Sequence, residues 1–355
     1  MNYIGSKYSL LPFLEESILS VADEQCAIFC DLFAGTGIVG RHFKQKGFKV
    51  IANDLQHYSY VLNRHYIGNN DVLSFENLLN ELPELANINI AERKYAVCHF
   101  LSDIAPVEGF LFHNYCSGGT KLKTYERLYF TDENGMLCDA IRSKIEDWYQ
   151  GNLITENEYY FLLTTLIESM DKLANTASVY GAFLKKIKRS ASAKLRMQAA
   201  EHSLDAQQHD VYCMDANKLI SSIKTDILYL DPPYNHRQYA PNYHLLETIS
   251  LYDNPPLKGK TGLRNYSHQK SDYSTKSKVK KAFQELILAA DARYIFLSYN
   301  NEGLLSLEDI KSIMSLRGEY GVFTKKYNRF KADKTENRNH IADSTTEYLH
   351  YVVVK

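Results

Sequence analysis

The chain has 355 residues, enough for about two domains of ordinary size. Its 41 Lys and Arg residues balance its 42 Asp and Glu residues, which excludes a uniformly basic protein but not a local basic face. No run approaches the roughly 18 apolar residues of a membrane span, and the N-terminus has no apolar segment of signal-peptide length. The six cysteines form no CxxC pair, which argues against structural zinc or a disulfide framework. We therefore expect a cytoplasmic protein without membrane contacts.

Short apolar runs that end in small or acidic residues are the clearest structural signal. Each has four to six apolar residues before a polar turn, which is typical of buried parallel strands with functional groups at their carboxyl ends. The runs are residues 27–37, 49–55, 210–216, 226–234 and 292–300. Helical patterns follow most of them, at 38–46, 55–66, 216–224 and 242–252. This alternation predicts an α/β fold with a doubly wound sheet.

One connection in this pattern is far too long. A strand-helix-strand unit needs about 30 residues, but the second strand ends near Asp54 and the third begins near Asp210. We therefore expect a catalytic domain formed by 1–87 and 205–355, with 88–204 inserted as a mostly helical domain.

Within the insertion and after the last apolar run, finer patterns can be read. Residues 109–135 are loop-rich and aromatic, whereas helices are expected at 139–150 and 156–177 and in a long run to His202. At the C-terminus, 320–330 and 347–355 predict an antiparallel hairpin at the sheet edge.

The first functional motif is DLFAGTG, residues 31–37, at the turn after the first strand. Glycines at such a turn let a ligand approach the backbone near a helix N-terminus. The letters GxGxxG also occur in dinucleotide sites, but the Asp31 carboxylate suits a cationic ligand such as S-adenosylmethionine better than a pyrophosphate. Asp54 can accept both ribose hydroxyls of either cofactor, or act only as a helix N-cap. The candidate cofactor-binding residues here are Asp31, Phe33, Ala34, Gly35, Gly37 and Asp54.

The second motif is Asp231-Pro232-Pro233-Tyr234, which ends the fourth apolar run. Two consecutive prolines cannot belong to the hydrogen-bonding ladder of a central strand, so they stiffen a turn that presents carbonyl acceptors. A carboxylate, fixed carbonyls and an aromatic face suit a planar ring with an exocyclic amino group. The alternative is a strand-terminating turn with a buried Tyr. These four residues are the candidate catalytic residues.

With these motifs the sequence resembles the amino-group DNA methyltransferases of the DNA adenine methylase type, over nearly its whole length. Residues 2–7 look like that group's N-terminal cofactor motif, and 213–216 look like the motif that contacts the adenine of the cofactor. Residues 298–300 and 327–330 look like its later motifs around the target base. The resemblance implies an S-adenosylmethionine-dependent methyltransferase fold, with S-adenosylhomocysteine as product. It adds Tyr3, Lys7, Asp215, Ala216 and Asp231 to the candidate cofactor-binding residues.

The mechanism expected from these residues needs neither a metal nor a Cys nucleophile. The amino nitrogen of adenine is a poor nucleophile, because its lone pair is delocalised into the ring. Asp231 and the Pro232 carbonyl are expected to accept its two hydrogens, while Tyr234 stacks on the base. An adenine within duplex DNA has to be flipped out to reach such a pocket.

Basic stretches at 184–197, 257–281 and 325–338 support a polyanionic partner, although a solvated surface is the alternative. Base reading is expected in the inserted domain. The candidate DNA-binding residues are Lys121, Lys123, Arg127, Lys185, Lys186, Lys188, Arg189, Arg237, Gln238 and Tyr239.

The leading hypothesis is a site-specific adenine methyltransferase acting on duplex DNA in a bacterial or phage setting, alone or beside a cognate restriction endonuclease. Three alternatives remain open from the sequence. They are a methyltransferase that acts on cytosine N4 or on RNA, a catalytically inactive DNA-binding protein that keeps the fold, and an oxidoreductase whose GxGxxG motif binds a dinucleotide.

Overall fold

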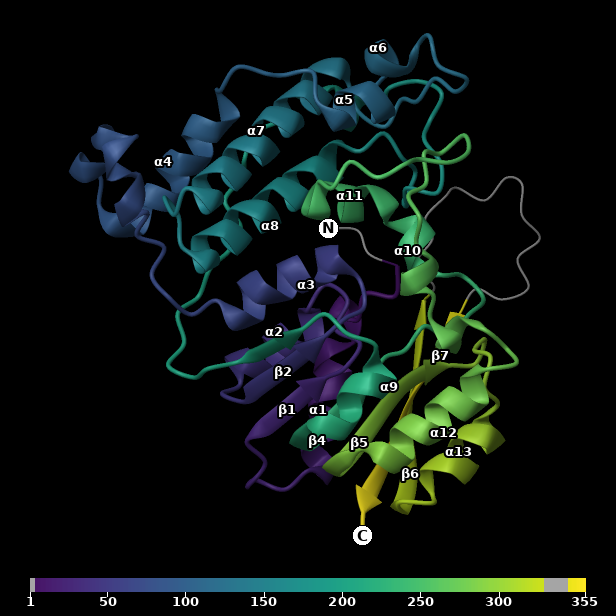
Figure 1. Ribbon diagram of the computed structural model, residues 1–355. Helices are drawn as coiled ribbons and strands as arrows, with labels where there is room; N and C mark the ends of the chain where they lie inside the picture. The colour runs from purple at the N-terminus through teal and green to yellow at the C-terminus, as the bar shows by residue number, and fades with distance from the viewer. Residues whose placement is uncertain (1–3, 329–343) are drawn as a thin grey trace. The chain divides into compact units, whose positions relative to one another are not determined.

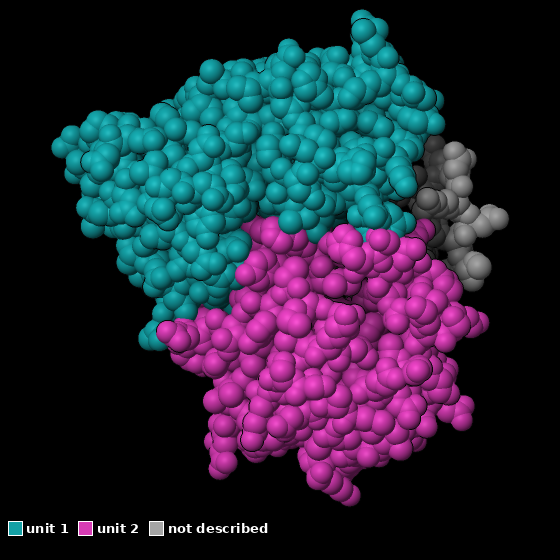
Figure 2. Space-filling model, in the orientation of Figure 1, with its two compact units in different colours: residues 1–3, 64–206, 240–266 teal, residues 4–63, 207–239, 267–355 magenta. Residues whose placement is uncertain are grey.

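The computed structural model describes residues 4–328 and 344–355, apart from the side chains of 327, 328, 344 and 345. The described chain divides into two compact units, coloured separately in Figure 2. A sheet unit contains residues 4–63, 207–239 and 267–355, and a helical unit contains 64–206 and 240–266. The helical unit therefore contains more residues than the expected insertion at 88–204: it begins at residue 64, and the later segment 240–266 also belongs to it.

The sheet unit is built on seven strands in the order β3-β2-β1-β4-β5-β7-β6. The strands are β1 (Ile28–Asp31), β2 (Lys49–Asn53), β3 (Asp210–Tyr212), β4 (Lys224–Leu230), β5 (Asp291–Asn300), β6 (Gly318–Asn328) and β7 (Ser344–Val354). The first five are parallel, as the apolar runs predict, and β7 pairs antiparallel with β5 and with β6. The C-terminal hairpin is thus confirmed, with β6 at the sheet edge and β7 one position inside it.

Helices cover both faces of this sheet (Figure 1). The helices of the unit are α1 (Leu11–Val21), α2 (Ile38–Gln45), α3 (His57–Asn63), α9 (Ala216–Leu219), α12 (Val279–Ala289) and α13 (Leu307–Met314). One core cluster joins a face of the sheet to α9, α12 and α13, and a second joins the other face to α1 and α2. The doubly wound α/β architecture expected from the sequence is therefore confirmed.

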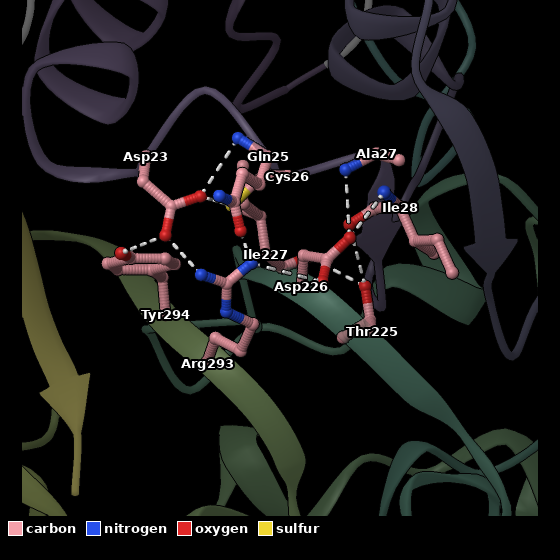
Figure 3. A network of polar contacts seen from close by, with 10 residues as sticks. All are labelled: Asp23, Gln25, Cys26, Ala27, Ile28, Thr225, Asp226, Ile227, Arg293 and Tyr294. Carbon is pink, nitrogen blue, oxygen red and sulfur yellow. Dashed lines mark hydrogen bonds and ion pairs between the residues drawn. The ribbon is translucent and has the colours of Figure 1, made fainter.

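Polar contacts tie the amino ends of three strands together (Figure 3). The Asp226 carboxylate, on β4, accepts hydrogen bonds from the backbone N–H groups of Ala27 and Ile28 at 2.8 and 2.9 Å. Arg293, on β5, forms an ion pair with Asp23 in the loop before β1. These contacts fix the strands at the end opposite to the functional motifs, which follow the carboxyl ends.

The helical unit is organised around two long helices. Its helices are α4 (Ile90–Ser102), α5 (Phe110–Tyr115), α6 (Ser117–Thr120), α7 (Asp132–Gln150), α8 (Glu156–Leu173) and α11 (His244–Leu251), and α10 (Tyr239–Asn242) spans the unit boundary. Thr155 and Glu158 form a reciprocal capping box that starts α8. The buried Arg142 guanidinium donates to the carbonyls of Ile249 and Ser250, which binds the later segment into the unit. None of the described helices is long and apolar enough to span a bilayer.

The helical run expected as far as His202 is wrong. Helix α8 ends at Leu173, and the chain from there to β3 is irregular apart from one 3-10 turn at Arg189–Ser192. The buried Asn175 explains the change. Its side chain donates to the carbonyls of Leu128 and Leu184 and accepts from the Lys188 N–H, so side-chain hydrogen bonds replace a helical ladder.

Candidate active site

The glycine motif forms a tight turn between β1 and α2. Gly37 is the N-cap of α2 and adopts φ 77°, a left-handed conformation that glycine adopts without strain. The Ala34 N–H donates to the Asn53 carbonyl at 2.8 Å, which fastens the turn to the end of β2. The turn therefore lies beside the next motif at the same edge of the sheet.

Two predicted acidic residues flank this turn. Asp54 accepts from the Gly35 N–H at 2.8 Å and from the Gln56 N–H at 2.9 Å, so it shapes the turn and caps the following segment. Asp31 is 1% exposed; its Oδ2 accepts from the Gly40 N–H at 3.1 Å, and its buried Oδ1 accepts no hydrogen bond from the described residues. A buried carboxylate oxygen without a donor suits a cationic ligand.

The Asp-Pro-Pro-Tyr motif follows β4, which pairs directly with β1. Its Asp231 carboxylate lies 3.2 Å from the Lys7 ammonium, which joins two residues that the family resemblance assigns to the cofactor site. Lys7 also lies 2.6 Å from Glu347 on β7, and its ammonium is 5.8 Å from the centre of the Tyr234 ring. The structure therefore brings Lys7 and Asp231 together, whereas Tyr3 lies outside the described residues.

The aromatic part of the motif is held from several sides. The Tyr234 carbonyl accepts from the Leu304 N–H at 2.9 Å, and the Tyr234 ring packs edge-on against Tyr299 at 6.0 Å. Gly5 has φ 80°, and a Cβ there would lie 3.0 Å from the Tyr239 hydroxyl. These contacts fix the turn that carries Asp231, while Pro232 is buried and Tyr234 remains partly exposed.

The acidic and basic groups perturb one another. Burial raises the pKa of Asp231 to about 6 against the opposing effect of Lys7, and Glu347 adds to the rise. Burial also raises the pKa of Asp31 to about 8, helped by the charges of Asp231 and Asp54. For Lys7, burial disfavours the ammonium, but Asp231 and Glu347 outweigh it and raise the pKa well above its ordinary value. Perturbed groups gathered at one edge of a sheet are typical of an active site.

A profile of the D12 class of N6 adenine-specific DNA methyltransferases matches residues 3–313, most of the chain and both motifs. The chain belongs to this family. Type II methyltransferase M.NlaIII of Neisseria lactamica is 52% identical over 353 residues, covering 99% of this chain and 98% of that protein. Type II methyltransferase M.CviAII of Paramecium bursaria Chlorella virus 1 is 33% identical over 356 residues, covering 100% and 99%.

A third relative is longer. Type II methyltransferase M.FokI of Planomicrobium okeanokoites is 39% identical over 355 residues, which cover 99% of this chain but 52% of that protein. As a D12 methyltransferase, the chain is an adenine-specific DNA methyltransferase, as its sequence predicts. The oxidoreductase interpretation of the GxGxxG letters is therefore rejected.

The predicted DNA-binding residues of this methyltransferase fall into two groups. Those exposed on their own units are Lys121, Lys123, Lys185, Lys186, Arg189 and Arg237; the Lys123 ammonium also donates to the His113 carbonyl and to the Asn114 side chain. The others, Arg127, Lys188, Gln238 and Tyr239, are less exposed and make internal contacts; the Tyr239 hydroxyl donates to the Ile4 carbonyl at 3.4 Å. Arg127 is buried and donates to three backbone carbonyls, of Asn114, Gly259 and Lys260, so it supports a loop. The Gln238 amide is bonded in both directions to the backbone of Ser271, and the Lys188 ammonium donates to the Thr176 carbonyl.

Three side chains that matter to this site are missing from the sequence-based set. Asn53 is 1% exposed and donates to the carbonyls of Leu32 and Met214, joining two turns. Glu347 pairs with Lys7 and accepts a hydrogen bond from the hydroxyl of Ser298, which belongs to the motif at 298–300 but not to the candidate residues. A polar residue inside or at the end of an apolar strand is the signal that could have identified all three. Asp215, predicted to contact the cofactor's adenine, is exposed and caps α9 by accepting from the Lys218 N–H.

Proposed function

We propose that this enzyme binds S-adenosylmethionine at the carboxyl ends of β1, β2 and β4 and methylates N6 of an adenine flipped out of duplex DNA. The observation that carries the proposal is the 3.2 Å contact between Lys7 and Asp231, directly after β4 and beside the glycine turn after β1. The carboxyl ends of two neighbouring parallel strands, at the point where the strand order reverses, are a common ligand site in α/β folds.

The residues at this edge fit a cationic nucleoside cofactor. Asp31 has a buried oxygen without a donor among the described residues, and Asp54 directly follows the neighbouring strand β2. We assign Asp31 to the positive charge and Asp54 to the ribose. We assign backbone contacts with the cofactor to Phe33, Ala34, Gly35 and Gly37. We assign contacts with its adenine to Asp215 and Ala216. When bound, S-adenosylmethionine supplies an electrophilic methyl group and is released as S-adenosylhomocysteine.

Asp231 and the Pro232 carbonyl prepare the target nitrogen. Both accept hydrogen bonds from the amino group, which localises its lone pair and points it out of the ring plane. Tyr234 offers its ring face to the base, and Pro233 stiffens the turn. The proton that the nitrogen loses is held at the Asp231 carboxylate before it reaches solvent. Positioning and fixed charge supply most of the rate.

The helical unit is assigned to DNA recognition because two segments that carry exposed lysines are joined within it. Asn175 bonds to the carbonyls of Leu128 and Leu184, which anchors the loop that carries Lys121 beside the segment of Lys185 and Lys186. Exposed cations on neighbouring loops can contact successive phosphates. Because the relatives are Type II methyltransferases, we also propose that this enzyme acts beside a cognate restriction endonuclease.

The test is to express the chain in methylation-deficient bacteria and to map modified bases in their DNA by long-read sequencing. We expect N6-methyladenine at one short motif, and its loss in the Asp231→Ala variant. In vitro, Asp231→Asn should lower kcat by about 10²–10³-fold, because one acceptor becomes a neutral amide. Methylcytosine, or full activity of the Asn variant, would overturn the proposal.

A further inference from the structure

Glu347 is a buried acid that the proposed mechanism does not use. It is 1% exposed, and its Oε1 lies 2.6 Å from the Lys7 ammonium and accepts a hydrogen bond from the Ser298 hydroxyl at 2.6 Å. Lys7 lies closer to Glu347 than to Asp231, at 3.2 Å. The lysine is therefore shared between two carboxylates, and the closer one is far from the catalytic motif in sequence.

The sheet brings these groups onto one face. Asp231 comes two residues after Tyr229, so the alternation of side chains along β4 places both on the same face. The Tyr229 ring packs in the core beneath α1. Ser298 pairs in register with Leu349, so Glu347, two residues before Leu349 on β7, is its diagonal neighbour on the same face. Lys7 comes from the segment that precedes α1 and covers this face. The Lys7 ammonium thus joins the end of β4 to β7, and Ser298 on β5 supports Glu347.

We infer that Glu347 is a positioning residue of the methyltransferase: it anchors the Lys7 ammonium and divides its charge with Asp231, which sets the orientation and protonation of the catalytic carboxylate. The inference rests on the proposed role of Asp231. Buried charges persist when they are paired, and removing one partner leaves the others uncompensated. Glu347 therefore acts on the reaction through Lys7, without touching the substrate.

The charged and titratable groups that face this cluster come from every neighbouring element. They are Lys7 from the N-terminal segment, Asp31 from β1, Tyr229 from β4, Tyr234 after β4 and Glu347 from β7. Lys325 pairs with Glu347 in register on β6, but its ammonium lies over the Phe13 ring at 5.5 Å. Burial raises the pKa of Asp231. Of the two charges nearest to it, Lys7 lowers this pKa and Glu347 raises it.

The decisive variant is Glu347→Gln, which keeps the shape and removes the charge. Lys7 then acts on Asp231 alone, so the acid limb of the kcat profile should move to lower pH, by about one unit. The ratio of kcat at pH 5.5 to kcat at pH 8 should rise about threefold, because more Asp231 is ionised at the lower pH. Residual loss of packing would lower kcat at every pH and leave this ratio unchanged, and that result would overturn the inference.

Asp226→Asn is the matched control. It removes a carboxylate from the amino end of β4, roughly 16 Å from Asp231 along the strand. There Asp226 accepts hydrogen bonds from the backbone of Ala27 and Ile28. Its unfolding temperature should fall while its pH profile stays that of the wild type. A shift in this control equal to that of Glu347→Gln would overturn the inference, because any lost carboxylate would then suffice.

Two further variants test the route through Lys7. On a Lys7→Met background, Glu347→Gln should shift the acid limb less than it does in the wild type; an equal shift would show that Lys7 is not involved. Glu347→Asp withdraws the charge from Lys7 by one methylene group, so the acid limb should move in the same direction as in Glu347→Gln, by a smaller amount. This variant carries the test if Glu347→Gln does not fold, and an unmoved limb in it would count against the inference.

The two proposals fail separately. An active Asp231→Asn enzyme would overturn the proposed function together with this inference. An inactive Asp231→Asn enzyme, combined with an unmoved profile in Glu347→Gln, would overturn only the role of Glu347.

Discussion

Asp31 ends a buried strand and has little compensation for its charge. One hydrogen bond, from the Gly40 N–H at 3.1 Å, reaches Oδ2, and the carboxylates of Asp231 and Asp54 are its charged neighbours. Burial, with these charges, raises the pKa of Asp31 from 3.8 to about 8. Since the folded state binds this proton more tightly than the unfolded state, its contribution to stability is full below pH 3.8 and is lost as the pH rises through about 8.

Asp31→Asn should therefore stabilise the protein without its cofactor. The amide keeps an acceptor for Gly40 and carries no charge, so the free energy of unfolding near pH 8 should rise by roughly 1–4 kcal/mol, and its dependence on pH should flatten. Affinity for S-adenosylmethionine should fall, because a counter-charge is lost. Urea unfolding over a pH series and titration calorimetry measure the two effects. Lower stability of the variant at pH 8 would contradict the argument.

At the scale of elements, Asn53 couples three segments. Its amide donates to the carbonyls of Leu32 at 3.1 Å and Met214 at 3.0 Å, and its carbonyl oxygen accepts from the Met214 N–H at 3.0 Å. One side chain thus joins the end of β2 to the glycine turn after β1 and to the turn before α9. The three segments that we assign to the cofactor depend on it for their spacing.

Asn53→Ala should cost about 2–4 kcal/mol of stability, because three backbone groups lose their partner. It should also weaken S-adenosylmethionine binding at least several-fold, since the turns drift apart. Asn69→Ala is the matched control: Asn69 is equally buried, and its amide donates to the Asn157 carbonyl within the helical unit. That control should lose stability and keep its cofactor affinity. Equal affinity in both variants would refute the role of Asn53.

Elements that depend on local apolar pattern could be predicted from the sequence, and elements that depend on distant partners could not. The five parallel strands and α2, α7, α8 and α11 lie where apolar periodicity places them. The segment 178–202 fails this rule because Asn175 binds its backbone from outside. Likewise, the family motifs predict Lys7 and Asp231 each as cofactor-binding residues but not their pairing, and nothing near Glu347 in the sequence identifies its partner, which lies 340 positions away.

At the scale of the whole molecule, a net charge of −1 conceals a local basic surface. In the helical unit, Lys185, Lys186 and Arg189 are exposed on a segment without acidic residues. Replacing all three by Ala should weaken DNA binding and lower the slope of log K against log salt by about 0.9 for each lost phosphate contact. Fluorescence anisotropy over a salt series measures this slope.

The control for this experiment comes from the sheet unit. The side chains of Lys46 and Lys49 are also partly exposed, and each forms an ion pair on its own unit, with Glu15 and Asp210. Their double replacement by Ala removes two positive charges and should leave the salt slope unchanged. If both sets of variants lower the slope alike, net charge rather than the helical unit governs binding.

The order of the strands also has a consequence for synthesis on the ribosome. Strand β1 pairs with β4, yet about 170 residues separate the end of β2 from the start of β4, and they take roughly 10–30 s to translate. During that interval β1 has one neighbour, and α1 and α2 have only half a sheet to cover. The helical unit is also incomplete during this interval, because its helix α11 is synthesised after β4. A nascent chain that stalls before β4 therefore carries two unfinished cores, with apolar side chains in contact with solvent that the finished fold buries.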